Sequence, residues 1–97
     1  MFGFHLPSNE NIILNYDEIN PAITLAVNVD NVIQITNLTH TLHEFVITLD
    51  GEEIVASRDI KPDTSGKFSV TPTQIGVYEY HYEYHPDTMK GIINELN

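Results

Sequence analysis

The residues best suited to chemistry lie near the end of the chain, in the run from Gly76 to Gly91, which reads GVYEYHYEYHPDTMKG. His85 and Met89 are spaced there like the ligands of a metal ion. Imidazole nitrogen and thioether sulfur both bind transition metals, and copper accepts both. A second imidazole, that of His43, lies at the start of an apolar segment earlier in the chain. These residue types indicate a metal site, provided that the fold brings the two segments together.

The elements that must position these residues are strands. Apolar residues recur with a period of two, which is typical of β-structure, and turn signals such as Asp50-Gly51 separate the segments. Seven or eight short strands of this kind predict an all-β fold, a Greek-key β-sandwich or barrel. No convincing amphipathic helix is present, although one helical turn could lie within 54–60. The predicted strands cover residues 12–16, 23–29, 32–35, 45–49, 54–55, 68–70, 77–84 and 92–93.

Alternation along the last long strand predicts which way its side chains point. Tyr78, Tyr80 and Tyr82 share one face, because successive side chains of a strand point to opposite sides. The intervening side chains are acidic or carry imidazole, so they belong to the solvent face: Glu79, His81 and Glu83. The tyrosines must therefore face the core, and Tyr82 is an inward residue near the end of its strand.

If this strand neighbours the one that starts near His43, four side chains converge at one pole of the sandwich: His43, Tyr82, His85 and Met89. Each also has an ordinary structural interpretation. Tyr82 can cap the core, and Met89 can fill an irregular gap in the packing, as methionine often does. A histidine taken singly is more often structural or exposed than a metal ligand. The metal interpretation depends on all four residues meeting.

The composition narrows the class of protein. Ninety-seven residues, 41% of them apolar, suit one folded domain. The formal net charge of -10 disfavours nucleic acid and anionic membrane surfaces, and it permits a basic protein partner. The absence of cysteine excludes disulfides and thiolate metal sites. No apolar stretch is long enough to span a bilayer, and the N-terminus lacks the pattern of an intact signal peptide. We expect either a cytoplasmic chain or a mature form without its leader.

From about Pro21 to Ile93 the chain resembles the cupredoxins, the small blue-copper domains. The segment from Asn37 to Phe45 is similar to the stretch in which an Asn precedes a copper-binding His followed by Phe. The run that begins at Gly76 resembles the family motif Gly-x-Tyr-x-Tyr-x-Cys-x-x-His-Pro-x-x-Met-x-Gly. Together and in this order the segments are a specific match.

The resemblance implies a single cupredoxin-like domain over residues 1–97 that binds copper and transfers electrons. It implies His43 and His85 as imidazole ligands and Met89 as the weak axial ligand. It also implies a periplasmic or other extracytoplasmic location, with the leader absent from this chain, and a redox partner that would be basic. The cysteine ligand of the family does not carry over, because Tyr82 occupies its position.

Tyr82 changes the chemistry expected of such a site. Blue-copper electron transfer depends on a copper–thiolate bond in a plane with two imidazoles. Phenolate oxygen is a harder donor that favours Cu(II) over Cu(I), so the reduction potential should fall and the intense blue absorption should be absent. We therefore expect a non-blue, type 2 Cu(II) site bound by His43, His85 and the oxygen of Tyr82, with Met89 as a further ligand.

Two other functions remain open at this point. Tyrosine is much longer than cysteine, so Tyr82 could fill the site and leave a metal-free binding module whose acidic surface recruits a protein. Alternatively, an open copper site could bind small ligands such as nitric oxide. The sequence offers no catalytic constellation apart from the metal site, so we do not expect an enzyme.

Overall fold

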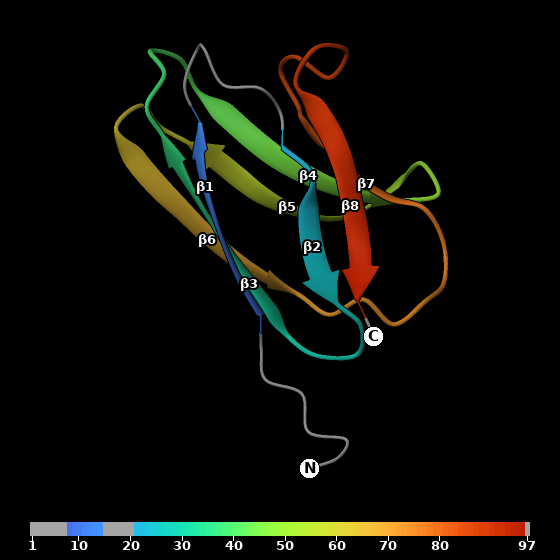
Figure 1. Ribbon diagram of the computed structural model, residues 1–97. Coiled ribbons are helices and arrows are strands. Elements are labelled where there is room, and N and C mark those ends of the chain that lie inside the picture. Colours follow the sequence, from blue (N-terminus) through green and yellow to red (C-terminus); the bar gives the residue numbers. More distant parts are fainter. Residues whose placement is uncertain (1–7, 15–20, 97) are drawn as a thin grey trace.

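The computed structural model describes residues 8–14 and 21–96, and of Ser8 and Asn9 it describes only the backbone. Eight strands follow one another in these ranges, and no helix interrupts them (Figure 1). Within the same ranges no helix has the length and apolar character needed to cross a bilayer. The strands are β1 (Ser8–Leu14), β2 (Ile23–Ala26), β3 (Asn31–Asn37), β4 (His43–Leu49), β5 (Glu52–Ile60), β6 (Thr64–Val70), β7 (Tyr78–Tyr82) and β8 (Lys90–Leu96).

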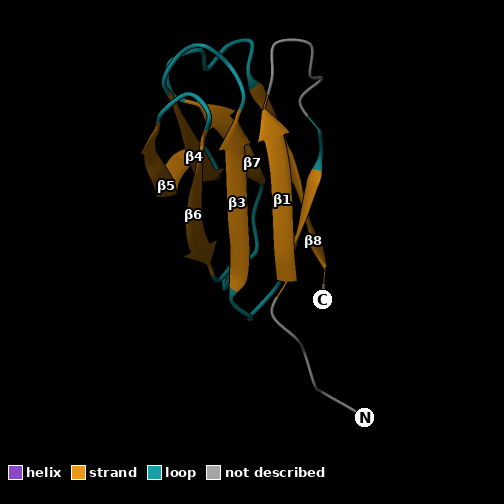
Figure 2. Cartoon of the chain, turned by 90° about the vertical axis from the view of Figure 1, so that its left-hand side faces the viewer, coloured by secondary structure: helices purple, strands orange, loops and turns teal. Residues whose placement is uncertain are grey.

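The strands form two sheets that face each other. One sheet has the order β1-β3-β6, which Figure 2 shows from its outer side, and the other has the order β2-β8-β7-β4-β5. The pairs β1–β3 and β2–β8 are parallel, and the remaining pairs are antiparallel. This arrangement confirms the predicted all-β sandwich.

The core lies between the sheets and is built by the alternation that the sequence showed. Tyr78, Tyr80 and Tyr82 are each only 2% exposed, so the tyrosine face of β7 does point inward. Apolar side chains from the facing strands pack against them, and burying such side chains supplies most of the driving force for folding. The buried cluster consists of Ile12, Leu14, Ile23, Leu25, Ile33, Ile35, Phe45, Ile47, Ile60, Val70, Tyr78, Tyr80, Tyr82 and Ile93.

The β4–β5 connection is the tight hairpin that Asp50-Gly51 predicted. Asp50 has a φ of 52° and Gly51 a φ of 88°, which is the pair of positive values that a type I′ turn requires. The possible helical turn within 54–60 was wrong, because β5 runs through the whole segment. A bulge in β5 opposite Phe45, where Arg58 has a φ of 68°, shifts the pairing register between β4 and β5. This shift interrupts the period-two alternation of side chains along β5.

Several further strand boundaries differ from the prediction. The strand predicted over 77–84, for example, is β7, which ends at Tyr82. The strand predicted over 23–29 ends at Ala26, because Asn28 adopts a positive φ of 65° and its N–H donates to the carbonyl of Pro72. The strand predicted over 92–93 extends from Lys90 to Leu96, and most of its residues are exposed, so few apolar side chains marked it in the sequence. Residues 15 and 16 of the first predicted strand lie outside the described residues.

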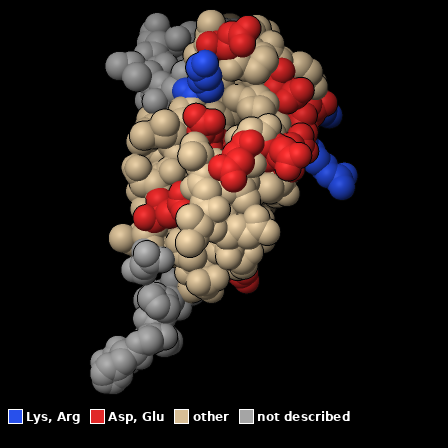
Figure 3. All heavy atoms as spheres, turned by 90° about the vertical axis from the view of Figure 1, so that its right-hand side faces the viewer, with Lys and Arg blue, Asp and Glu red and all other residues tan. Residues whose placement is uncertain are grey.

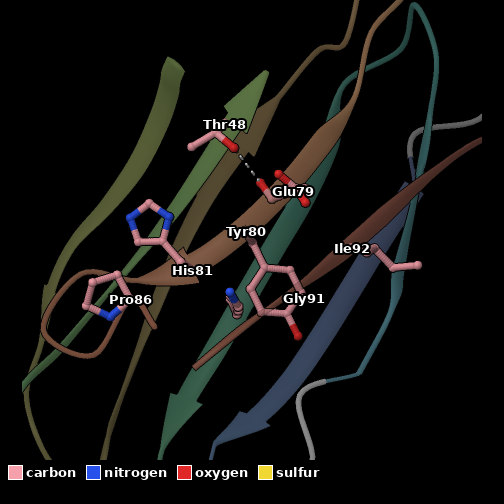
Figure 4. A pocket seen from close by; sticks show the side chains of 8 residues that line it. Thr48, Glu79, Tyr80, His81, Pro86, Gly91 and Ile92 are labelled. Atoms are coloured by element: carbon pink, nitrogen blue, oxygen red, sulfur yellow. Dashed lines mark hydrogen bonds between the residues drawn. The ribbon is translucent and has the colours of Figure 1, made fainter. Parts of the chain in front are cut away.

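Gly91 is required where β8 crosses the ring of Tyr80, and Figure 4 shows the two residues together. A Cβ at this position would lie 2.6 Å from three atoms of the Tyr80 phenol. The ring is held in place, because its hydroxyl donates a 2.5 Å hydrogen bond to the carbonyl of Pro21.

We expect Gly91→Ala to lower the free energy of unfolding by about 1–3 kcal/mol, the usual cost of overpacking a core. Urea denaturation followed by circular dichroism measures this. Asn94→Ala on the exposed part of the same strand is the control and should change stability by less than about 0.5 kcal/mol. Equal stability of both variants would show that the Tyr80 ring is free to move away.

Candidate metal centre

The register between β4 and β7 determines where the predicted site residues lie. The two strands are antiparallel, with Phe45 opposite Tyr82. The first residue of β4, His43, and the last residue of β7, Tyr82, therefore lie at the same pole of the sandwich. The loop 83–89 begins and ends at this pole, since the N–H of Tyr82 donates to the carbonyl of Met89 at 2.8 Å.

The ring of His43 lies close to the rings of two other predicted site residues, Tyr82 and His85. The ring centroid of His43 lies 5.8 Å from that of Tyr82, with the planes at 80°, and 5.8 Å from that of His85, with the planes at 52°. His43 is 2% exposed, whereas His85 is exposed at the surface. The pole therefore combines one buried imidazole, one exposed imidazole and one buried phenol.

Tyr82 is part of the core as well as part of the pole. Its ring packs edge-on against Phe45, with centroids 5.3 Å apart, and against Tyr80 at 6.1 Å. With only 2% of the residue exposed, the ring is not turned out into solvent. Any metal that binds His43 at this pole must therefore lie beside a fixed phenol ring.

His43 is the residue whose surroundings point to a ligand. Its Nε2 lies 3.2 Å from the hydroxyl oxygen of Thr41, and its Nδ1 is the only buried side-chain nitrogen or oxygen without a hydrogen-bond partner among the described residues. An unpaired buried polar group costs about 1–3 kcal/mol, so a persistent one calls for an explanation. Burial, followed by the nearby His85, lowers the pKa of His43 and favours its neutral form. A neutral imidazole is the form that binds metals, so these residues fit a transition-metal ion.

The loop before β4 is held by Asn37, which is fully buried. Its Nδ2 donates to the carbonyls of Thr41 at 2.9 Å and Ile60 at 2.8 Å, and its Oδ1 accepts from the N–H and the hydroxyl of Thr39. These bonds satisfy the amide and join the end of β3 to the end of β5. They fix the path of the chain into His43.

The loop that carries His85 is fixed mainly by its own backbone. The N–H of His85 donates to the carbonyl of Tyr82, and the N–H of Met89 donates to the carbonyl of His85. Tyr84 adds a 2.6 Å hydrogen bond from its hydroxyl to Asp59 on β5, and this bond is the main reason that the pKa of Tyr84 is raised. Met89 is half-buried and packs against the core cluster. Its ligand role stays a prediction.

Among the described residues, no three His, Cys, Asp or Glu side chains are grouped so that they could hold a metal. A metal at this pole would need donors of other types, and the phenol of Tyr82 is such a donor. His81 lies on the outer face of the sheet, in a pocket that Thr48, Glu79 and Pro86 also line (Figure 4). Its Nε2 lies 3.1 Å from a carboxylate oxygen of Glu83.

Sequence reasoning missed Thr41, whose hydroxyl contacts His43. Residues two apart on a strand share a face, which is the one sequence signal that could have drawn attention to it. Thr41 precedes β4, however, and lies in a polar loop where that rule does not apply.

The comparisons with known proteins agree with this fold. Residues 7–93 match the family model described as a cupredoxin-like domain. The chain belongs to the cupredoxin-like family. A search of curated proteins found no match.

Solved cupredoxins share the fold at low sequence identity, which supports the fold alone. The reduced auracyanin of the photosynthetic bacterium Roseiflexus castenholzii has a TM-score of 0.75 and 16% identity, over 96% of this chain and 100% of that one. The purple cupredoxin of Nitrosopumilus maritimus has a TM-score of 0.58 and 17% identity, over 92% and 99%. A methionine-to-alanine mutant of amicyanin with Cu(I) has a TM-score of 0.61 and 19% identity, over 90% and 81%.

In the metal-free protein, the free energy of unfolding should fall as the pH drops below about 6.5, with His43 as one cause. In the unfolded chain the His43 side chain has its ordinary pKa of about 6.5, so it takes up a proton below that pH. In the folded protein burial, and secondly His85, lower the pKa of His43, so the folded state binds this proton less readily and loses stability relative to the unfolded chain. Above that pH the His43 side chain is neutral in both states, and its contribution to the free energy of unfolding is fully present.

Urea denaturation at a series of pH values, for the wild type and His43→Gln, isolates this contribution as the difference between the two curves. His40→Gln, which removes an exposed imidazole from the same loop, is the matched control. An identical pH dependence for wild type and His43→Gln would contradict the assignment.

Proposed function

We propose that the protein binds Cu(II) at the pole formed by His43, Tyr82 and His85. The observation that carries the proposal is the buried Nδ1 of His43, which has no partner in the described part of the chain. The His43 ring lies 5.8 Å, centroid to centroid, from both the His85 imidazole and the Tyr82 phenol. A metal ion would satisfy this nitrogen. Met89, in the same loop as His85, is a further ligand candidate.

Copper is favoured over other metals for two reasons. Sites built from nitrogen and oxygen donors bind Cu(II) most tightly among the divalent first-row ions. The cupredoxin family also binds copper and transfers electrons to partner proteins, and the amicyanin structure named above contains Cu(I). The low pKa of His43 keeps a lone pair available to the ion at neutral pH.

Tyr82 makes the proposed site a non-blue one. Copper supplies one-electron redox chemistry when it is bound, and a hard phenolate donor favours the oxidised ion. The residues of the chain then have separate tasks: His43 binds from inside, Tyr82 excludes water from the inner side, and exposed His85 faces the solvent. Slow electron transfer or copper holding fits this arrangement better than rapid electron transfer.

A redox partner would meet an acidic surface. Figure 3 shows acidic side chains gathered over one face of the molecule, with few basic ones among them. Asp59, Glu44 and Glu83 all lie close enough to Tyr84 to raise its pKa, so acidic residues border the His85 loop. A basic partner would be attracted to this pole. Members of the family are typically extracytoplasmic, and we propose the same location for this chain.

The burial of Tyr82 favours a second candidate function. The ring is packed on Phe45, Tyr80 and His43 like any core residue, so it can close the pole without binding metal. The protein would then be a metal-free binding module. Cu(II) would leave its melting temperature unchanged, because only a ligand that binds the native state stabilises it.

Titration of the metal-free protein with Cu(II), followed by calorimetry and by optical and paramagnetic spectra, tests the proposal. We expect one tight site with a phenolate-to-copper absorption band and a melting temperature raised by copper. His43→Ala and His85→Ala should each abolish tight binding, since each removes an imidazole ligand. Tyr82→Phe should remove the absorption band and weaken binding, because it deletes only the oxygen.

His81→Ala is the matched control, because this imidazole lies on the outer face of the sheet and should not affect the site. Tight binding that survives both His43→Ala and His85→Ala would refute the proposal. Absence of any copper-induced change in melting temperature would favour the closed, metal-free module instead.

A further inference from the structure

The two ring nitrogens of His43 have different surroundings. Nε2 lies 3.2 Å from the hydroxyl oxygen of Thr41, within hydrogen-bond distance. Nδ1 is buried without a partner among the described residues. A neutral imidazole carries its proton on one nitrogen only, and the hydrogen bond made at one nitrogen determines which. The hydroxyl of Thr41 is thus placed to decide which nitrogen of His43 carries the proton.

Two arrangements are compatible with this contact. If the hydroxyl donates to a bare Nε2, the imidazole proton must be on Nδ1, where a buried N–H finds no acceptor. Orphaned buried N–H groups are rare, because their desolvation is not repaid. If Nε2–H donates to the hydroxyl instead, Nδ1 carries a lone pair, and the hydroxyl proton of Thr41, an exposed residue, can reach water. The second arrangement leaves no donor unsatisfied.

We propose that Thr41 is a positioning residue that sets the tautomer of His43: its hydroxyl accepts a hydrogen bond from Nε2–H and leaves the lone pair of Nδ1 free for a metal ion. The part of this inference that concerns the metal rests on the proposed function, and the part that concerns the tautomer does not. The loop itself holds Thr41 in place, because the buried amide of Asn37 donates to the Thr41 carbonyl at 2.9 Å.

This bond would prepare the site before any metal arrives. An imidazole in the other tautomer would have to move its proton before Nδ1 could bind an ion. Partners on the second nitrogen of a ligating histidine also orient the ring and raise its basicity, and their loss typically lowers metal affinity about 10- to 100-fold.

Nitrogen-15 NMR of labelled histidine in the metal-free protein reads the tautomer directly, at a pH well above the ordinary histidine pKa of about 6.5. In the wild type we expect the proton of His43 on Nε2. Thr41→Val keeps the shape and removes the hydroxyl, so it should shift the population toward Nδ1–H. Thr41→Ser should restore the wild-type spectrum. Thr48→Val, which removes a hydroxyl near the other end of β4, is the matched control and should have no effect.

Titration of the same variants with Cu(II) measures the effect of Thr41 on metal affinity. Thr41→Val should bind Cu(II) about 10- to 100-fold more weakly than the wild type and Thr41→Ser should not. A wild-type proton on Nδ1, or a Thr41→Val protein with unchanged tautomer and affinity, would overturn the inference. A wild type that binds no copper would refute the proposed function, and the NMR result would still decide the role of Thr41.

Discussion

The antiparallel register of β4 and β7 is the constraint on which the rest of this molecule depends. With Phe45 opposite Tyr82, the start of one central strand and the end of the other must meet at one pole. The same register directs the tyrosine face of β7 into the core, where Phe45 stacks on Tyr80 with centroids 4.9 Å apart. The packing that stabilises the sandwich therefore also places His43 and Tyr82 at the same pole. A shift of one residue would turn every side chain of β7 to the opposite face.

The buried imidazole of His43 lowers the stability of the fold relative to an apolar side chain at the same place. A sandwich of this kind could bury an apolar side chain at position 43, yet it buries an imidazole with one nitrogen that has no partner among the described residues. The surroundings lower the pKa of that imidazole and favour its neutral form. Asn37 fixes the loop that leads into it, because the buried amide is hydrogen-bonded to residues of the 38–42 loop and to the end of β5. Unsatisfied buried groups of this kind are common at functional sites, since a ligand supplies the missing partner. Tyr82 adds a buried phenol ring to this pole, packed edge-on against Phe45.

Local periodicity was enough to predict much of this. The alternation of tyrosine with charged residues correctly oriented β7, and Asp50-Gly51 correctly placed the hairpin. The bulge at Arg58 could not be predicted, because it depends on how β5 pairs with β4, where Ser57 supplies its side-chain oxygen to the N–H of Phe45. The contact between Thr41 and His43 was equally hidden, since it depends on a loop path set by Asn37 and Ile60. The family resemblance implied which strands are neighbours, and this strand order brings the pole residues together. Which of these residues bind a metal remains a prediction.

The proposed copper ion binds between His43 and His85, beside Tyr82. Anomalous X-ray scattering at the copper edge, from crystals grown with Cu(II), tests this most directly because it locates the ion without reference to any spectrum. We expect one strong peak at the pole, next to Nδ1 of His43 and the imidazole of His85. No peak at that pole, or a peak only beside His81 and Glu83 on the outer face of the sheet, would contradict it.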